Sequence, residues 1–324
     1  MERNSYAVLR LLADGTFRSG AAIGRALRLS RVSVEVALRE IAARGIEVVK
    51  ARGRGVRLAQ PFDALDAGVV RRELAALGAP LRLEVLDECS STNALALDRA
   101  ALGGASGTVI ACELQTAGRG RHGRRWLTGL GDALTFSLIW RFEVAPAALG
   151  GLSLAVGVGC ARGLEEVGVH GVALKWPNDL VLDGAKLGGI LVEVRGEASG
   201  PCVAVIGVGI NIKLSATVRG EIAQPVTDLA AAGTRPARNE LLARLLASVA
   251  AAAATFERRG FAAFREAWLR HHAWQGRRVR VQLAPRRSVD GVAAGVADDG
   301  ALLLETARGV ERFHAGEVSL RKAA

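Results

Sequence analysis

The sequence predicts an α+β protein in three successive parts: a helical N-terminal unit, a mixed central unit and a small all-β C-terminal unit. Three patterns predict this. Apolar residues at helical spacing dominate the first 45 or so positions, strand-like and helix-like runs mix between about 80 and 275, and alternating runs fill the last fifty. The central helices are clustered rather than regularly interleaved, which favours a mixed or mostly antiparallel sheet over a doubly wound one.

Length and composition are those of an ordinary globular protein. The chain has 324 residues, of which 50% are hydrophobic and 23% charged, and this suits several domains. Its first ten residues lack the apolar core of a secretion signal, and the longest apolar stretch, around 150–159, is shorter than a bilayer requires. Four scattered cysteines show no CxxC spacing. We therefore expect a cytoplasmic protein with no membrane partner and no metal held by a protein cluster.

The N-terminal part reads as three helices and a hairpin. Residues 5–13 predict a short helix, Ser19 can cap a second, and Ser30 can cap a third. Two alternating runs around a glycine turn then predict a basic hairpin within 46–58. This order is that of a winged helix-turn-helix, with expected bounds 1–62.

The central and C-terminal parts follow from strand and turn signals. Strands are expected at 83–86, 109–113, 134–140, 172–174, 180–182, 187–194 and 203–212, and helices at 92–101, 147–167, 239–258 and 261–271. In the last fifty residues, turns are expected at Asp290-Gly291, Asp299-Gly300 and Arg308-Gly309, which predicts a small SH3-like barrel.

Charge is concentrated in two places. The net charge is +11, and residues 1–60 alone hold 12 basic against 5 acidic residues. Four further arginines lie within Gly118–Arg125. Because each concentration attracts an anionic partner, we expect nucleic acid at the first and phosphate or carboxylate groups at the second.

The segment Gly118–Trp126, GRGRHGRRW, is the most informative. Its glycines let the backbone wrap closely, and its arginines offer forked donors that match phosphate or carboxylate. It is not a P-loop, because GxxxxGK[ST] is absent, nor a dinucleotide fingerprint, because no helical run follows. A nucleic-acid-binding RGG-like segment or a solvated loop also fits these residues taken alone.

Three further motifs carry polar or glycine-rich groups at the ends of expected elements. They are SSTN at 90–93, KWPND at 175–179 followed by KLGGIL at 186–191, and GVGIN at 207–211. Each has an ordinary explanation: Ser91 can be a helix cap and Lys186 a solvated strand end. Paired glycines beside Lys186 indicate close approach of a strand or a flat ligand.

Together, and in this order, these motifs closely resemble those of the biotin–protein ligases, specifically the bifunctional type that also acts as the biotin operon repressor. The resemblance covers essentially the whole chain. It rests on STN at 91–93, QTAGRGRHGRRW at 115–126, KWPNDL at 175–180, KLGGILVE at 186–193, GVGIN at 207–211 and EVSLR at 317–321. It implies a class II synthetase-like catalytic domain at 63–275 and an SH3-like domain at 276–324.

The resemblance implies a two-step reaction. Biotin attacks the α-phosphate of ATP to give biotinyl-5'-AMP and diphosphate, and the biotinyl group then passes to a lysine of a carboxylase's biotin carboxyl carrier protein. The first step needs cations rather than a protein nucleophile, because charge develops on phosphoryl oxygens, and Mg²⁺ accompanies the ATP. A loop that orders over the adenylate would also keep it from water.

The resemblance also implies residue roles. The implied catalytic residues are Lys186, Arg119, Arg121 and Asp179, with Asp179 orienting the incoming lysine amine or accepting its proton. Biotin would contact Ser91, Thr92, Asn93, Gln115, Arg119, Gly120, Arg121, Lys186, Gly188 and Gly189. The nucleotide would contact Arg121, Arg124, Trp126, Asn178, Lys186, Asn211 and Arg321, with Trp126 on adenine and Mg²⁺ near Asn178.

The N-terminal part is expected to bind operator DNA. The expected contacts are Ser30, Arg31, Ser33, Arg52, Arg54 and Arg57. The third helix departs from the family's well-studied repressors, because Glu35, Val36 and Ala37 follow its Ser-Arg start. A glutamate can read cytosine but also repels phosphate. The resemblance further implies a homodimer when the protein is loaded with adenylate, which would couple the ligand to DNA.

Three other functions remain open on the sequence. The chain could be a monofunctional ligase with a degenerate DNA-binding domain, or a lipoate-attaching enzyme with a similar catalytic fold. It could also be a transcription factor that only senses a small molecule. The arginine-rich loop argues against the lipoate enzyme, and the full set of catalytic-type residues argues against the pure sensor.

Overall fold

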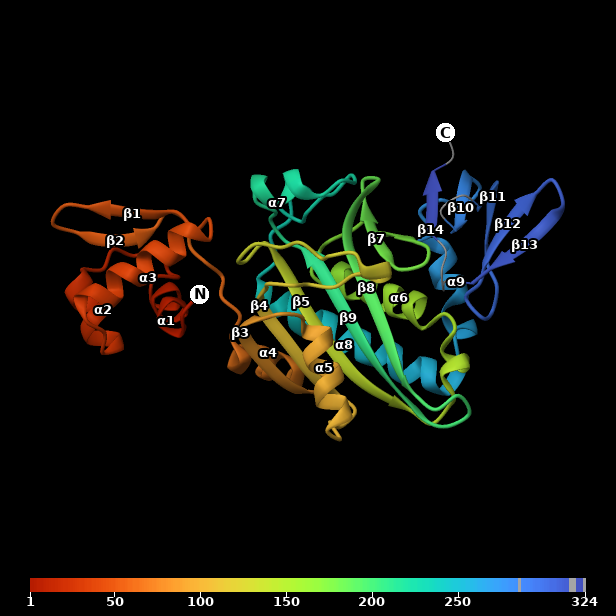
Figure 1. Ribbon diagram of the computed structural model, residues 1–324, viewed down its shortest axis with the longest axis horizontal. Helices are drawn as coiled ribbons and strands as arrows, with labels where there is room; N and C mark the ends of the chain where they lie inside the picture. The colour runs from red at the N-terminus through yellow and green to blue at the C-terminus, as the bar shows by residue number, and fades with distance from the viewer. Residues whose placement is uncertain (285–286, 315–318, 323–324) are drawn as a thin grey trace.

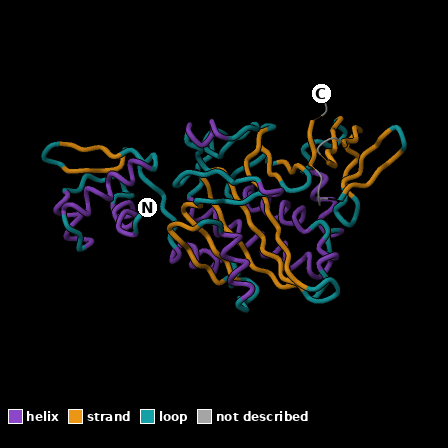
Figure 2. Tube along the Cα trace, in the orientation of Figure 1, coloured by secondary structure: helices purple, strands orange, loops and turns teal. Residues whose placement is uncertain are grey.

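The computed structural model describes the backbone of residues 1–284, 287–314 and 319–322, and the side chains of 1–283 and 288–314. Three regions follow one another in space as in sequence (Figure 1): helices with a hairpin at the N-terminal end, a large central sheet with helices, and a smaller sheet at the C-terminal end. The tube view shows that strands dominate the C-terminal region and helices the N-terminal one (Figure 2).

The N-terminal region has the expected order of elements. It comprises α1 (Arg3–Leu11), α2 (Gly20–Leu27), α3 (Arg31–Ala43), β1 (Val48–Ala51) and β2 (Gly55–Leu58). The Ser19 side chain caps α2 by accepting from Ala22 N, and that of Ser30 caps α3 by accepting from Ser33 N. Each cap satisfies an amide that would otherwise lack a partner, as the sequence predicted.

A seven-stranded mixed sheet forms the centre of the molecule. Its strands are β3 (Arg82–Cys89), β4 (Thr108–Gln115), β5 (Ala133–Phe142), β6 (Ala173–Lys175), β7 (Asp179–Leu182), β8 (Ala185–Gly196) and β9 (Cys202–Asn211), in the order β3-β4-β5-β9-β8-β7-β6. Only β3 and β4 pair in parallel, and the other described pairs are antiparallel. The expected mixed sheet is confirmed.

Helices cover both faces of this sheet. Helix α5 (Thr92–Ala101) packs with Ile110, Ile139 and Val205 on one face. Helices α6 and α8 belong to the large core on the other face. The bounds of the central helices other than α5 are α4 (Ala67–Ala76), α6 (Leu152–Glu165), α7 (Ala216–Glu221), α8 (Arg238–Arg259) and α9 (Ala262–Arg270).

The prediction of a single helix at 147–167 was wrong. The segment divides into a 3-10 turn at Pro146–Leu149 and α6, because Gly151 lies between them with φ +80. Helices α4 and α7 were not expected at all.

The stretches Pro146–Glu165 and Arg238–Arg259 are long and apolar enough to cross a membrane, but 67% and 56% of their most apolar windows are buried in the core. Such burial is typical of core helices.

The C-terminal region is an antiparallel five-stranded sheet, in the order β13-β12-β11-β10-β14. Its strands are β10 (Arg278–Ala284), β11 (Arg287–Val296), β12 (Leu302–Thr306), β13 (Gly309–Phe313) and β14 (Ser319–Lys322). The turn expected at Asp290-Gly291 was wrong: both residues lie within β11, where Asp290 pairs across the sheet with Arg280. The other two expected turns join β11 to β12 and β12 to β13.

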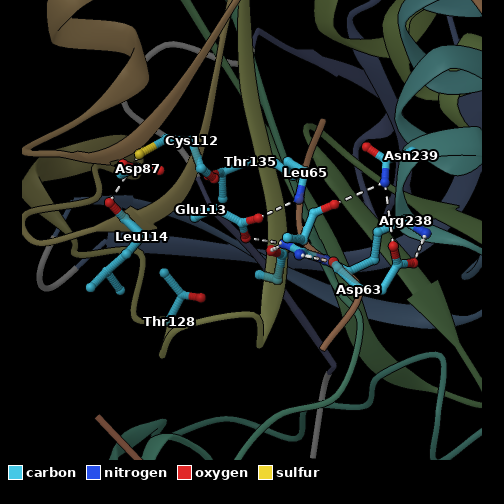
Figure 3. Close-up of polar contacts among 12 residues, drawn as sticks. Asp63, Leu65, Asp87, Cys112, Glu113, Leu114, Thr128, Thr135, Arg238 and Asn239 are labelled. Atoms are coloured by element: carbon cyan, nitrogen blue, oxygen red, sulfur yellow. Dashed lines mark hydrogen bonds and ion pairs between the residues drawn. The ribbon is translucent and has the colours of Figure 1, made fainter. Parts of the chain in front are cut away.

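The segment that joins the N-terminal region to the sheet is held by buried polar contacts (Figure 3). Arg238, at the start of α8, forms an ion pair of 2.9 Å with Glu113 of β4, and both side chains are buried. Backbone amides of Arg238 and Leu65 donate to the carboxylates of Asp63 and Glu113, respectively. The connecting segment therefore has a fixed path along the sheet.

Candidate active site

A cavity of about 730 Å³ opens where the long β4–β5 loop, strands β8 and β9 and the segment around α7 meet. Figure 1 shows α7 and the β7–β8 hairpin at this same end of the sheet. Most of the site residues expected from the sequence line it. These are Ser91, Thr92, Asn93, Gln115, Arg119, Gly120, Arg121, Arg124, Trp126, Asn178, Lys186, Gly189 and Asn211.

Two expected residues do not line the cavity, and the side chain of a third is not described. Gly188 does not line the cavity, because its Cα faces the backbone of β9, where a Cβ would lie 2.7 Å from the carbonyl oxygen of Gly209. Asp179 is also absent from the lining and lies behind Lys186. The side chain of Arg321 lies outside the described residues. Sequence position alone could not tell which of two adjacent glycines faces a ligand.

The floor of the cavity is a network of buried polar groups. The amide nitrogen of Thr92 donates to Gln115 Oε1 at 2.7 Å. Ser137 Oγ donates to Asn93 Oδ1 at 2.6 Å and lies 2.8 Å from Thr92 Oγ1. Ser91 caps α5 as well as lining the cavity. The expected polar residues are therefore brought together and held in fixed orientations for a ligand with both donors and acceptors.

The arginine-rich loop is folded on itself. Within the segment Gly118–Trp126, which we call the flap, Trp126 N donates to Gly118 O at 2.9 Å and Gly120 N donates to Arg124 O at 2.7 Å. His122 at its tip has φ +55, a conformation for which few residues are suited. The flap is thus an irregular hairpin whose arginines lie beside the cavity.

Two of the flap arginines contact residues across the cavity. Arg119 forms an ion pair with Glu193 of β8 at 2.8 Å, and Arg121 Nη1 donates to Asn178 Oδ1 at 3.4 Å. Burial lowers the pKa of Arg121, and the neighbouring Arg124 lowers it further, whereas Asp179 opposes both. A positive charge held in partly desolvated surroundings is stabilised by an anionic ligand.

Lys186 lines the cavity and is paired with Asp179. Its Nζ lies 2.6 Å from Asp179 Oδ1, and Lys175 Nζ lies 3.8 Å from the second oxygen of that carboxylate. All three side chains are mostly buried. Asp179 therefore holds the Lys186 ammonium at the cavity wall.

Trp126 closes the base of the flap over two glycines. A Cβ on Gly209 would lie 2.7 Å from the Trp126 ring, and one on Gly189 would lie 3.5 Å from it. The indole Nε1 is buried and has no hydrogen-bond acceptor among the described residues. A buried donor without an acceptor in a cavity wall indicates that a ligand supplies the acceptor or covers the ring.

Asn211, Asn178 and the segment 221–226 complete the wall. The Asn211 amide donates to the carbonyl oxygens of Thr227 at 2.9 Å and Lys186 at 3.4 Å, and Asn178 Nδ2 donates to Ile190 O at 2.8 Å. Both asparagines thus hold the backbone around the cavity. Of the described lining residues only Glu221 carries a carboxylate, and no described group of three His, Cys, Asp or Glu could hold a metal.

The sequence did not single out several of these residues. Glu193, Ser137 and the segment 221–226 all contribute to the cavity or its network. Glu193 was inside a quoted motif, and an acidic residue near the end of an otherwise apolar strand was a usable signal. Ser137 and 221–226 carried none, because their approach depends on strand order and on the path of a long loop.

Four of the six expected DNA-binding residues are exposed. Ser30, Arg31, Arg52 and Arg54 are exposed, and Ser33 is half-buried. Arg57 is half-buried, and its Nη1 donates to the backbone oxygens of Leu58 and Ala59. Glu35 on α3 forms an ion pair of 3.1 Å with Lys50 of β1, so the carboxylate is partly neutralised by the hairpin.

Comparison with known proteins decides the family. Residues 86–211 match the Biotin/lipoate A/B protein ligase family, and residues 276–321 match the Biotin protein ligase C terminal domain. The Bifunctional ligase/repressor BirA of Escherichia coli (strain K12) is 36% identical over 317 residues, which cover 98% of this chain and 97% of that protein. The chain belongs to the biotin protein ligase family. The resemblance inferred from the motifs is confirmed.

Other relatives of this ligase agree. The Biotin--[acetyl-CoA-carboxylase] ligase of Mycobacterium tuberculosis is 35% identical over 260 residues, which cover 78% of this chain and 95% of that one. The solved structure of the biotin protein ligase from Aquifex aeolicus in complex with biotin and ATP has a TM-score of 0.62 and 26% identity, covering 75% of this chain and 99% of that chain. The mixed α/β catalytic fold with a β-rich C-terminal region is therefore shared.

Proposed function

We propose that this ligase condenses biotin with ATP to give biotinyl-5'-AMP and diphosphate. It then transfers the biotinyl group to a lysine of a biotin carboxyl carrier protein and releases AMP. The observation that carries the proposal is the single cavity in which Lys186, Arg121 and Arg124 surround a hydrogen-bonding floor. Cations around one cavity suit a reaction in which negative charge develops on a phosphate. The relatives that bind biotin and ATP support the choice of substrates.

The place of each residue in the cavity supports a different ligand contact. Thr92, Asn93 and Gln115 of the floor would recognise the polar ring of biotin, while Lys186 would contact its carboxylate and the α-phosphate. Trp126 would lie against adenine, where its buried Nε1 can find an acceptor. Mg²⁺ supplies charge to the phosphates when ATP is bound, and this lining suits an ion carried by phosphate oxygens rather than by a protein cage.

In the second step Asp179 would serve the incoming lysine. Its carboxylate forms an ion pair of 2.6 Å with Lys186, which lines the cavity. An acceptor amine must lose a proton to attack the mixed anhydride, and a carboxylate within reach can orient it or take that proton. Asp179 is therefore assigned to transfer rather than to adenylate formation.

Diphosphate release tests this proposal against a lipoate-attaching function. Purified protein with MgATP and biotin should release diphosphate and yield biotinyl-AMP, whereas lipoate should give little. Equal release with both acids, or release with lipoate alone, would contradict the assignment.

We also propose that the N-terminal region, residues 1–62, is a winged helix-turn-helix that represses transcription when the protein is a dimer loaded with adenylate. Its element order, its excess of basic residues and the relatives named bifunctional ligase/repressor support this. A gel shift on the biotin-synthesis promoter of its own genome, with and without biotin and MgATP, tests it. Lack of binding under both conditions would favour a monofunctional ligase.

We also propose the bounds of the other two domains and the cellular compartment. A class II synthetase-like catalytic domain would span 63–275 and an SH3-like domain 276–324, and the protein would act in the cytoplasm. Separate cores at the N-terminal end and in the sheet support the first boundary. The five-stranded antiparallel sheet supports an SH3-like assignment for the last region.

A further inference from the structure

Glu193 is an acidic residue next to the cavity, in contact with two lining residues, that the roles above do not use. Its Oε1 accepts from Arg119 Nη2 at 2.8 Å, and its Oε2 accepts from Asn93 Nδ2 at 3.0 Å. The side chain is 19% exposed, whereas the Arg119 side chain is 47% exposed. One carboxylate therefore connects the start of the flap to the floor of the cavity.

The floor side of this contact has a fixed orientation. Asn93 Oδ1 must be the acceptor for Ser137 Oγ at 2.6 Å, so its Nδ2 is the group that donates to Glu193 and to Leu191 O at 3.2 Å. Asn93 is buried, and β9 approaches it so closely that any Cβ on Gly207 would overlap its amide oxygen. Glu193 thus receives a donor that cannot turn away.

The flap side is less constrained. The flap is a hairpin held by its own backbone hydrogen bonds, and it lies in the loop that leaves the sheet at Gln115 and returns to it at Ala133. Arg119 is near that exit, so an ion pair there fixes the direction in which the whole hairpin extends. Charge-assisted hydrogen bonds to a partly buried carboxylate are stronger than neutral ones.

We propose that Glu193 is a positioning residue that keeps the flap closed over biotinyl-AMP until the acceptor lysine arrives. This inference rests on the proposed ligase function and deepens it. Because Glu193 neutralises Arg119, Arg119 serves to hold the flap, while Arg121 and Arg124 are the flap arginines assigned to the ligand. The same carboxylate also accepts a hydrogen bond from Asn93 of the floor. The fit of biotin on the floor and the closure of the flap therefore depend on one group.

Retention of the intermediate tests the proposal. Wild type and Glu193→Gln are loaded with biotin and MgATP, freed of excess substrate, and sampled over time for bound biotinyl-AMP by mass spectrometry. We expect about tenfold faster loss from the variant, equivalent to about 1.4 kcal/mol, with a raised KM for biotin and little change in kcat for adenylate formation. Glu197→Gln, an exposed glutamate just beyond β8, is the matched control and should retain adenylate like wild type.

A double-mutant cycle identifies the partner. Arg119→Gln breaks the same contact from its exposed side, and the double variant should lose adenylate no faster than Arg119→Gln alone. Additive losses, or retention in Glu193→Gln equal to wild type, would overturn the proposal. A lowered melting temperature without faster loss would overturn it too, because it would make Glu193 merely structural. A wild type that forms no biotinyl-AMP would instead contradict the proposed function, and the inference would fall with it.

Discussion

The N-terminal and C-terminal regions are attached to the central sheet in different ways. C-terminal residues such as Val281 and Leu304 belong to the same hydrophobic core as the sheet and its helices. The N-terminal helices have a core of their own, to which the central region contributes Leu114 and Leu130. One region is thus continuous with the catalytic core, and the other is docked against it.

The contacts at the two junctions differ in kind. At the C-terminal junction the backbones touch: a Cβ on Gly300 would lie 2.5 Å from Gly151 Cα, and Trp176 Nε1 donates to Gly300 O at 3.1 Å. At the N-terminal junction charged groups meet, since the N-terminal ammonium lies 2.7 Å from Glu88 and Arg10 lies 2.5 Å from Asp87. The C-terminal joint is thus made by close backbone packing, and the N-terminal joint by ion pairs and a few apolar contacts.

The largest expected effect is at the buried clamp of the connecting segment. Glu113→Gln leaves the Arg238 guanidinium buried without its counter-charge, and breaking such a pair costs about 3–5 kcal/mol. Denaturant unfolding followed by fluorescence measures this loss. The exposed Glu165→Gln serves as control, and a change below about 1 kcal/mol at Glu113 would show that the clamp is not a rigid part of the N-terminal junction.

The C-terminal junction gives the next largest effect. Gly300→Ala should lower the free energy of unfolding by about 3 kcal/mol, because it adds a backbone clash to the strain of a positive φ. Gly276→Ala, also at positive φ but with open space around it, should lose only about 1 kcal/mol. Equal losses would mean that the close approach of Gly300 and Gly151 is unimportant.

The two regions also differ in how far the sequence predicted them. Both helix caps of the N-terminal region, Ser19 and Ser30, were read correctly, because capping depends on neighbours within three residues. The Asp290-Gly291 turn failed because Arg280, ten residues away, pairs with Asp290 within a strand. Contacts between residues close in the chain can be predicted from the sequence, whereas contacts between strands depend on the register of the sheet.

The same distinction holds at the site. The motifs identified most lining residues, but the choice of Gly189 over Gly188 depends on which face of β8 meets the cavity. The partners of Lys186 and Arg119, which are Asp179 and Glu193, come from the pairing of β7 with β8 and from the path of the flap. Spacing alone does not encode these contacts.

A smaller, pH-dependent effect is expected at Glu88. Partial burial raises the pKa of its carboxyl, but hydrogen bonds from the N-terminal ammonium and Tyr6 lower it more, so the folded pKa lies below the usual value. The ionised Glu88 carboxylate therefore stabilises the folded protein above the unfolded pKa of about 4.3, and this stabilisation is lost as pH falls through the folded pKa. At pH 7 the free energy of unfolding of wild type should exceed that of Glu88→Gln by about 1 kcal/mol, and this difference should shrink as the pH falls below about 4.3. A difference that did not shrink there would contradict this assignment.

The smallest effect is expected at the Arg10–Asp87 ion pair. Both side chains are about one-third exposed or more, so Asp87→Asn should change stability by only about 0.5 kcal/mol, and high salt should erase the difference. Thermal unfolding at low and high salt measures it. A loss as large as that of Gly300→Ala would remove the distinction between a docked and a continuous region.

Native mass spectrometry of the intact protein mixed with biotin and MgATP tests the central assignment most directly. We expect a mass increase equal to one biotinyl-AMP per chain in wild type and none in Lys186→Met. The exposed Lys213→Met should behave like wild type. A wild type that acquires no biotinyl-AMP, or a Lys186→Met variant that acquires it as readily, would contradict the claim that Lys186 and the flap arginines enclose one phosphate-binding cavity.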